Sequence, residues 1–396
     1  MKSILLECSI LAGSHTSCNL AQELQRVVTD FNLQHKITLA ISDNAANIKR
    51  AIKEELQWRH LGCFAHLINL IIRDGLAVVK ELLEKIKTMV IFFKRSGAGR
   101  EKLMNFQSSM GCTQPRKLLL DVETRWNSTF YMLQRFCELE DAIKSSIALV
   151  DKDLPILTSV HELCKILKPF ESVTTSLSGE NYATASVVIV LVNGLNDIYD
   201  KLLLQNFTHT VHKVIQALKT GIENRLGNVE NSNILTLCTF LDPRFKTIPF
   251  QNPHTAEKVK RNVTNVISNK RKSSQIVSNE GTSQSNSSES DELSPWNLFN
   301  KCLANAKPQG TSTSRAILEV QRYMYSDILD HSGDPLKWWY DHRAHLPHLS
   351  GIAQETLCSL ATSVPCEILF SKAGLFLNER RTRLQGSTTP VFECKL

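Results

Sequence analysis

A short apolar run that ends in a carboxylate is the feature that most constrains the fold of this chain. The run is Lys36-Ile-Thr-Leu-Ala-Ile-Ser-Asp43, rich in β-branched residues, and such a run is typical of a buried strand that leads into a loop. The segments around it are helical in spacing over Leu20–Phe31 and Asn47–Leu56, and strand-like over Ser3–Leu11 and Leu61–Ala65. Strands and helices that alternate at this spacing predict an α/β unit with parallel pairing.

The pattern becomes helical from His66 onward. Apolar residues recur there at three- and four-residue intervals as far as Val90, which predicts one long amphipathic helix, and further helical patterns extend to about Asn224. Asn269–Asp291 has almost no apolar residues, so it cannot repay the entropy of ordering and is predicted to be a disordered linker. Helical periodicity returns from Ala316 to about Leu384, with a break at Asp334-Pro335.

Composition limits the class of protein. The chain has 396 residues, 42% hydrophobic and 21% charged, as expected for a globular protein of two or three domains. Its net charge of +7 permits a polyanionic partner, although a chain of this length also carries such an excess as ordinary solvated surface. Eleven cysteines without a C-x-x-C spacing favour a reduced intracellular compartment. No apolar run is long enough to span a bilayer, so no membrane partner is expected.

Two isolated carboxylates are candidate metal ligands. Asp43 follows a predicted central strand, where open α/β sheets place such groups, but a Ser-Asp-Asn sequence also simply caps a following helix. Glu367 is a lone acid among apolar and small residues, where an unpaired charge is costly. Mg²⁺ binds one or two protein carboxylates together with substrate phosphates. No glycine-rich phosphate loop, H-E-x-x-H or nucleophile elbow is present, and no small-molecule substrate is expected.

Three further motifs have both a functional and a structural interpretation. Cys63 and His66 have half of a zinc-site spacing, but no second pair completes it, which favours a buried thiol and a histidine at a helix start. Arg125-Trp126 is suited to contact a phosphate and stack on a base, or it is a surface arginine beside a core tryptophan. Trp338-Trp339 is a packing anchor in a core or an interface.

The order of these motifs resembles the hAT transposase superfamily, in particular its zinc finger BED domain-containing members. The matching blocks are Ser42-Asp-Asn-Ala-Ala-Asn47, Cys63-Phe-Ala-His-Leu-Ile-Asn-Leu70, Thr124-Arg-Trp-Asn-Ser128, Leu241-Asp-Pro-Arg-Phe-Lys246, Trp338-Trp339 and Thr362-Ser363 with Glu367 and Phe370-Ser371. They extend over nearly the whole chain.

The resemblance implies an α/β plus α fold, in which a ribonuclease H-like core, truncated at its N-terminus, is interrupted by a large all-α insertion and followed by C-terminal hAT dimerisation helices. The expected domains are a partial core over 1–100, a helical insertion over 101–268, a disordered linker over 269–292, and a dimerisation region that completes the core over 293–396.

The resemblance also assigns roles to residues. Asp43 and Glu367 correspond to the second and third members of an Asp-Asp-Glu triad that would bind Mg²⁺ only if catalysis survives. Arg125, Trp126 and His66 are implied DNA-binding residues. The residues implied in dimerisation are Trp338, Trp339 and Phe370.

The departures from the family pattern set the expected function. Neither the first Asp of the triad nor the BED finger is found upstream of Asp43, and Ile368 stands where the family usually has Arg. Since two-metal chemistry needs that ligand, we expect an inactive relic without a cofactor: a nuclear protein that forms a homodimer through its C-terminal region, with DNA as a candidate second partner. The alternatives are an active, Mg²⁺-dependent DNA transposase and a helical interaction scaffold without DNA contact.

Overall fold

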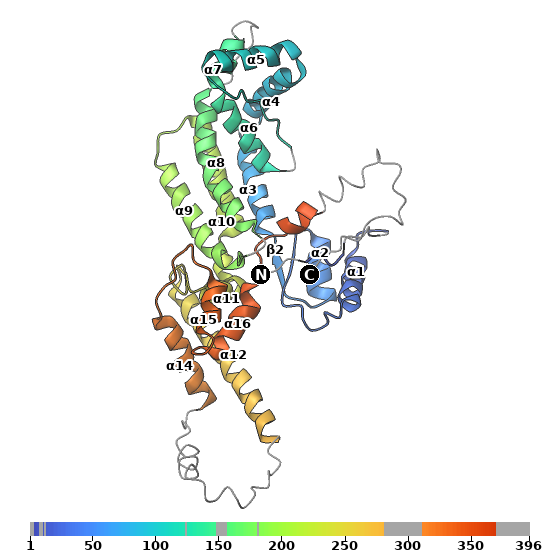
Figure 1. Ribbon diagram of the computed structural model, residues 1–396, viewed down its shortest axis with the longest axis vertical. Coiled ribbons are helices and arrows are strands. Elements are labelled where there is room, and N and C mark those ends of the chain that lie inside the picture. The colour runs from blue at the N-terminus through green and yellow to red at the C-terminus, as the bar shows by residue number, and fades with distance from the viewer. Residues whose placement is uncertain are drawn as a thin grey trace, which may run out of the picture. The chain divides into compact units, whose positions relative to one another are not determined.

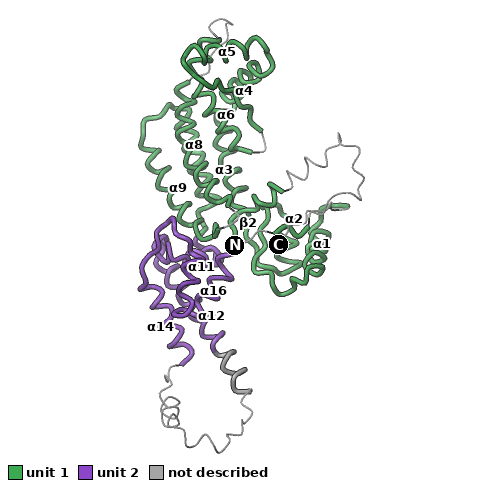
Figure 2. Tube along the Cα trace, in the orientation of Figure 1, with its two compact units in different colours: residues 1–229, 359–396 green, residues 230–358 purple. Residues whose placement is uncertain are grey.

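The computed structural model describes residues 4–7, 11, 13–122, 125–147, 157–179, 182–280 and 311–369. These residues are mostly helical, with one two-stranded parallel sheet. The chain divides into two compact units, which Figure 2 distinguishes by colour: unit 1 holds residues 1–229 and 359–396, and unit 2 holds residues 230–358. None of the helices in the described ranges is both long and apolar enough to span a membrane.

A small α/β part of unit 1 contains the sheet. Strand β1 (Ala40–Ser42) pairs in parallel with β2 (His60–Gly62), in the register Ala40 to His60 and Ser42 to Gly62. Helix α1 (Ser17–Asp30) packs on α2 (Ala46–Arg50) and on the π-helical turn η1 (Ala51–Glu55) that continues it (Figure 1). The predicted parallel pairing of these two runs is confirmed.

The strand predicted over Ser3–Leu11 is wrong for residues 4–7, which are irregular. Glu7 instead forms an ion pair with Arg26 of α1, with 2.5 Å between the nitrogen and the oxygen. This contact holds the segment on the helix surface by a side chain, and β1 gains no second neighbour from it among the described residues.

In the rest of unit 1, helices α3, α6, α8, α9 and α10 run alongside one another, and α4, α5 and α7 are gathered at one end of them (Figure 1). Helix α10 packs along α3 and α9, and α6 packs along α8. The bounds are α3 (Phe64–Ala77), α4 (Lys80–Arg95), α5 (Gly97–Ser109), α6 (Trp126–Glu138), α7 (Glu140–Ile147), α8 (Leu157–Leu177), η2 (Ala185–Val187), α9 (Val188–Leu203) and α10 (His209–Leu226). The turn η3 (Val229–Asn231) contains the residue at which unit 1 gives way to unit 2.

The single long helix predicted over His66–Val90 is wrong, because α3 and α4 are separate. Val79 leaves the helical conformation, with φ −114° and ψ 24°, and α4 begins anew at Lys80. The apolar positions continue across this break without losing their spacing, so the periodicity of the sequence contains no sign of it. Close packing fixes α3 on α10: a Cβ at Gly75 would lie 2.5 Å from Leu218 Cδ2.

Unit 2 is helical in its described part. It contains α11 (Asn233–Leu241), α12 (Pro253–Glu280), α14 (Ser312–Tyr325), α15 (Pro335–His342) and α16 (Pro347–Leu357). The phenol of Tyr323 donates to the Phe240 carbonyl oxygen at 2.8 Å, and the indole of Trp339 donates to the Leu241 carbonyl oxygen at 2.7 Å. These bonds tie α14 and α15 to the end of α11.

Helix α12 corrects part of the predicted disordered linker. It continues to Glu280, so residues 269–280 of that linker are helical, whereas residues 281–292 lie outside the described ranges. Val259, Val263 and Ile267 are buried on one face of α12, which packs along α14. Once packing has nucleated the helix, each further residue gains one backbone hydrogen bond, so the helix can continue into a polar segment.

Candidate functional site

The carboxyl ends of β1 and β2 form one edge of the sheet, which we call the carboxylate edge (residues 42–44, 62–63 and 363–367). Asp43 follows β1 and Cys63 follows β2. The Cys63 amide donates to the Ser42 carbonyl oxygen at 2.8 Å, and the Asn44 side chain donates to the Cys63 carbonyl oxygen at 3.3 Å. The loops that leave both strands are therefore held together at this edge.

A distant segment returns to the same edge. The Phe64 amide donates to the Ala361 carbonyl oxygen at 3.0 Å, and the Ser363 amide donates to Cys63 Sγ at 3.4 Å. Thr184 and Leu177 bind the same segment through the Ala361 amide and the Thr362 hydroxyl. Residues 364–369 then form a helical turn that contains Glu367, so Glu367 lies one turn from Ser363, which contacts Cys63 at the carboxylate edge.

Both predicted carboxylates are solvent-exposed and engaged locally. Asp43 Oδ1 accepts a hydrogen bond from the Ala45 amide at 3.1 Å, and Glu367 Oε1 accepts one from the Ser363 hydroxyl at 3.3 Å. The first bond is a short turn before α2; the N-cap of that helix is Ala45 and no side chain caps it, so Asp43 does not cap α2 as the capping alternative expected. Within the described ranges no group of three His, Cys, Asp or Glu side chains is arranged to hold a metal ion.

Cys63 and His66 differ in their accessibility. The Cys63 side chain is fully buried at the N-cap of α3, while His66 is half-buried in the first turn of that helix. Cys63 Sγ accepts the Ser363 amide, so this thiol has a structural role at the carboxylate edge.

His60 is a polar residue of this region that the motifs did not single out. Its Nε2 lies 2.9 Å from the Ser42 hydroxyl on the neighbouring strand. Burial lowers the pKa of His60, the positive charges of Lys53 and Lys49 lower it further, and Asp43 opposes them. Parallel pairing of the two strand-like runs was the signal that could have placed His60 beside Ser42.

Arg125 and Trp126 are neighbours in the sequence, but the first side chain is exposed to solvent and the second is buried. Arg125 is exposed at the N-cap of α6, whereas Trp126 is 6% exposed and packs against Phe130 and Phe170, with ring centroids 6.3 and 6.4 Å away. The Trp126 amide also donates to Asn69 Oδ1 at 3.3 Å. The structure thus has the core tryptophan beside a surface arginine, and a base has no access to the Trp126 ring in this arrangement.

The residues implied in dimerisation are also divided. Trp339 is buried in unit 2, and Trp338 is half-buried, with its ring stacked on His342 at a centroid distance of 3.8 Å. Phe370 lies outside the described residues. The two tryptophans therefore anchor α15 within unit 2.

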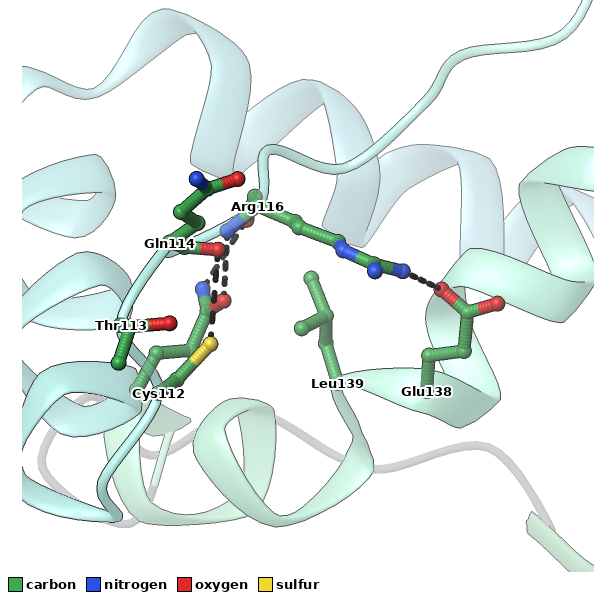
Figure 3. A pocket seen from close by; sticks show the side chains of 7 residues that line it. Cys112, Thr113, Gln114, Arg116, Glu138 and Leu139 are labelled. Atoms are coloured by element: carbon green, nitrogen blue, oxygen red, sulfur yellow. Dashed lines mark hydrogen bonds and ion pairs between the residues drawn. The ribbon is translucent and has the colours of Figure 1, made fainter.

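A separate pocket of about 320 Å³ lies between the segment after α5 and the end of α6. Figure 3 shows Arg116 extended towards Glu138 on one side and Cys112, Thr113 and Gln114 on the other. Arg116 pairs with Glu138 at 3.3 Å, and Gln107 binds the backbone amide and carbonyl of Arg116. The bonds of Gln107 and Glu138 to Arg116 thus join the two sides of this pocket.

Comparison with known proteins identifies two regions of the chain. Residues 61–167 match the ZBED1 RNase-like helical domain, and residues 319–394 match the hAT family C-terminal dimerisation region. The chain is 28% identical to the maize (Zea mays) protein named "Putative AC transposase", over 96% of this chain and 51% of that protein. It is 27% identical to human (Homo sapiens) zinc finger BED domain-containing protein 4, over 93% of this chain and 32% of that protein.

A rice protein extends the range of relatives. Zinc finger BED domain-containing protein RICESLEEPER 3 from Oryza sativa subsp. japonica is 20% identical over 97% of this chain and 55% of its own length. The chain thus spans about half or less of the length of these curated relatives. The resemblance seen in the motifs is confirmed: this chain is a relative of hAT transposases and zinc finger BED domain-containing proteins.

Proposed function

We propose that this chain belongs to a transposase-derived nuclear protein that self-associates, contacts DNA and does not cleave it. The observation that carries the proposal is the return of Ala361–Ser363 to Cys63 and Phe64. It supports the view that a ribonuclease H-like core is interrupted by the helices between α3 and this segment. On this proposal the carboxylate edge corresponds to the active-site region of a transposase, and its surface binds DNA without cutting it.

Positive charge beside the carboxylate edge supports DNA contact. Lys53 and Arg59 are exposed, and the charges of Lys49 and Lys53 act on His60. The test is binding of a duplex oligonucleotide over a series of salt concentrations. Lys53→Gln is expected to weaken binding and to reduce the slope of log K against log salt by about one. The matched change Lys102→Gln, on the exposed side of α5, should leave both unchanged. No binding at any salt concentration would favour an interaction scaffold without DNA contact.

The proposal that the protein does not cleave DNA concerns the two carboxylates that meet at the carboxylate edge. Asp43 and Glu367 share an edge, but in-line phosphoryl displacement by two metal ions requires a fuller carboxylate set. We expect no nicking of hairpin or terminal-repeat DNA with Mg²⁺ or Mn²⁺. Nicking that Asp43→Asn abolishes would instead establish the second candidate, an active DNA transposase, which the shared edge of the two carboxylates favours.

Self-association is supported by the match to a dimerisation region over residues 319–394. Because Trp339 is buried within unit 2, a more exposed apolar side chain of the same region is a better probe. Tyr325 is 88% exposed in unit 2, and Leu204 is 87% exposed in unit 1. In analytical ultracentrifugation at micromolar concentration, Tyr325→Ser should weaken a dimer, and Leu204→Ser should not. A monomeric parent protein would contradict homodimerisation.

Nuclear localisation is supported by the kinds of relative, and it does not depend on the basic cluster Lys270-Arg-Lys272. Arg271 pairs with Glu319, and Lys270 pairs with Glu355, so two of the three basic side chains are engaged in ion pairs within unit 2. A fluorescent fusion should reach the nucleus and should still do so with Lys270→Gln. A cytoplasmic parent fusion would contradict the proposal.

A further inference from the structure

Two cysteines face each other where α6 packs along α8. Cys137 is in the last turn of α6 and Cys164 is within α8, 27 positions later, with 3.9 Å between their Sγ atoms. Both thiols are half-buried, and each is a free cysteine. The α6–α8 packing thus holds the two sulfur atoms side by side. A disulfide has a sulfur–sulfur distance of about 2.05 Å, so the two atoms need to approach each other only a little further to form one.

A histidine lies close enough to the thiol pair for its charge to act on Cys137. His161, one turn before Cys164 on α8, has Nε2 2.5 Å from Glu140 Oε2, and Glu140 also binds Lys144. The hydrogen bond to Glu140 raises the pKa of His161, which favours an imidazolium near the sulfur atoms. The His161 side chain is 54% exposed, so solvent and small solutes reach this group.

The two thiols differ in their electrostatic surroundings. The contact with the Cys164 thiol lowers the pKa of Cys137, and the charge of His161 lowers it further, against the opposing effects of burial and of Glu140 and Glu138. The same thiol pair contact and burial raise the pKa of Cys164. Because the thiolate is the reactive form, the positive charge of His161, which acts on Cys137, favours Cys137 as the thiol that reacts first.

We propose that Cys137 and Cys164 form a reversible redox site that a peroxide converts to a disulfide. The Cys137 thiolate attacks one peroxide oxygen, the O–O bond breaks, and hydroxide leaves with a sulfenic acid on Cys137. Cys164 then attacks the Cys137 sulfur, the S–O bond breaks, and water leaves. In sum, two thiols and hydrogen peroxide give one disulfide and two waters, and a dithiol reductant reverses the change.

The disulfide has a consequence for the fold. It joins α6 to α8 and closes the chain between positions 137 and 164, which constrains the unfolded state and raises thermal stability. Both cysteines lie within residues 61–167, the matched helical domain. A metal site is a poorer explanation, because within the described ranges no three His, Cys, Asp or Glu side chains are arranged to hold an ion.

The test is peroxide titration of the reduced protein, followed by alkylation of the remaining thiols, digestion and mass spectrometry. We expect a linked peptide pair that contains Cys137 and Cys164, at a lower peroxide concentration than oxidises the exposed Cys112 or Cys358. Dithiothreitol should restore both thiols, and the oxidised form should have a higher Tm. A higher threshold for this pair than for the exposed thiols, or pairing of these cysteines with others, would overturn the proposal, as would one tightly bound zinc ion per chain that Cys137→Ser releases.

Variants separate the roles of the residues. Cys164→Ser should leave a sulfenic acid on Cys137 that a dimedone reagent traps, while Cys137→Ser should leave Cys164 largely reduced. His161→Gln should slow disulfide formation at neutral pH and move its rate profile to higher pH. The control is Lys165→Gln, which removes a neighbouring positive charge on α8, where Lys165 donates to Gln205. It should change neither the rate of disulfide formation nor the pH dependence of that rate. Circular dichroism of the reduced forms checks folding. If a variant is unfolded, the order in which limiting iodoacetamide alkylates the parent's thiols decides instead, and alkylation of Cys164 before Cys137 would contradict the assigned order.

Discussion

Glu319 and Arg271 form an ion pair with 2.9 Å between the guanidinium nitrogen and the carboxylate oxygen. The Glu319 side chain is 4% exposed, and its second oxygen accepts the backbone amides of His348 and Leu349 at 2.7 and 2.8 Å. One carboxylate on α14 thus joins α12 to the first turn of α16. Two amides that would otherwise lack partners at a helix start are satisfied in this way.

Replacement of Glu319 by Ala should therefore destabilise unit 2 strongly. The change leaves a largely buried guanidinium and two amides without a partner, and breaking a buried pair in this way costs about 3–5 kcal/mol. Urea unfolding followed by tryptophan fluorescence measures the effect. The matched control is Glu257→Gln, which removes an exposed pair with Lys260 on α12 and should cost at most about 1 kcal/mol. Equal effects of the two changes would show that Glu319 does not organise these helices.

Gly62 is required by the close approach of Asn44 at the carboxylate edge. A Cβ at Gly62 would lie 2.2 Å from Asn44 Oδ1, so Gly62→Ala must displace the Asn44 side chain and break its bond to Cys63. We expect a loss of about 1–3 kcal/mol, typical of overpacking. Gly194, in α9, has nothing within 4 Å of the same construction, and Gly194→Ala should stabilise by about 0.5–1 kcal/mol. Thermal unfolding of both variants checks the prediction. A stabilised Gly62→Ala variant or a destabilised Gly194→Ala variant would contradict it.

The elements that the sequence predicted well are those with a strong local cause. β1 (Ala40–Ser42) ends a run whose β-branched residues Ile37, Thr38 and Ile41 suit a half-buried pleated surface. Asp334 caps α15 by accepting the Leu336 amide, as the predicted break indicated. The gap between α3 and α4 has no such cause, because the apolar spacing is the same on both sides of it.

The site was predictable only in part, for a physical reason. Periodicity shows that a residue lies on an apolar face, but not which partner covers it. Arg125-Trp126 therefore left two interpretations open. Phe130 lies on the same helix as Trp126, but Phe170 contacts the ring from α8, which periodicity within α6 does not reveal. The return of Ser363 to Cys63 spans 300 positions, and no local pattern predicts a pairing at that separation. The family resemblance alone pointed to it, through Glu367.

Acidification should destabilise unit 1 through His60. Burial and the charges of Lys53 and Lys49 lower the pKa of His60 below its ordinary value of 6.5. As the pH falls below 6.5, the unfolded chain takes up a proton there more readily than the folded chain does. The free energy of unfolding therefore falls with pH until the folded pKa is reached, where the loss levels off.

Two variants test this pH dependence. His60→Gln should flatten this part of the stability profile relative to the parent protein. Lys53→Gln removes a positive charge that disfavours protonation of His60, so it should raise the pKa of His60 in an NMR titration. Lys102→Gln should leave that titration unchanged. A His60 resonance that titrates above pH 6.5 in the parent protein would contradict the sign of the effect.

Arg125 and Trp126 should respond to substitution in opposite ways, because one is exposed and the other belongs to the core of unit 1. Trp126→Ala removes a large buried ring and is expected to lower the free energy of unfolding by about 3–5 kcal/mol. Arg125→Gln should change stability by no more than about 0.5 kcal/mol. If Arg125 contacts a phosphate, the same change should weaken duplex binding and lower the salt slope by about one.

The matched control for this pair of changes is Arg100→Gln, an exposed charge on α5 that should affect neither property. Urea unfolding and a salt-dependent binding assay on the same preparations separate the two effects. Trp126→Phe provides the decisive comparison, because it keeps an aromatic ring in the same core. If Trp126→Phe were fully stable yet lost DNA binding as completely as Arg125→Gln, the ring would have to reach the nucleic acid, and the buried position of Trp126 would not be its DNA-bound state.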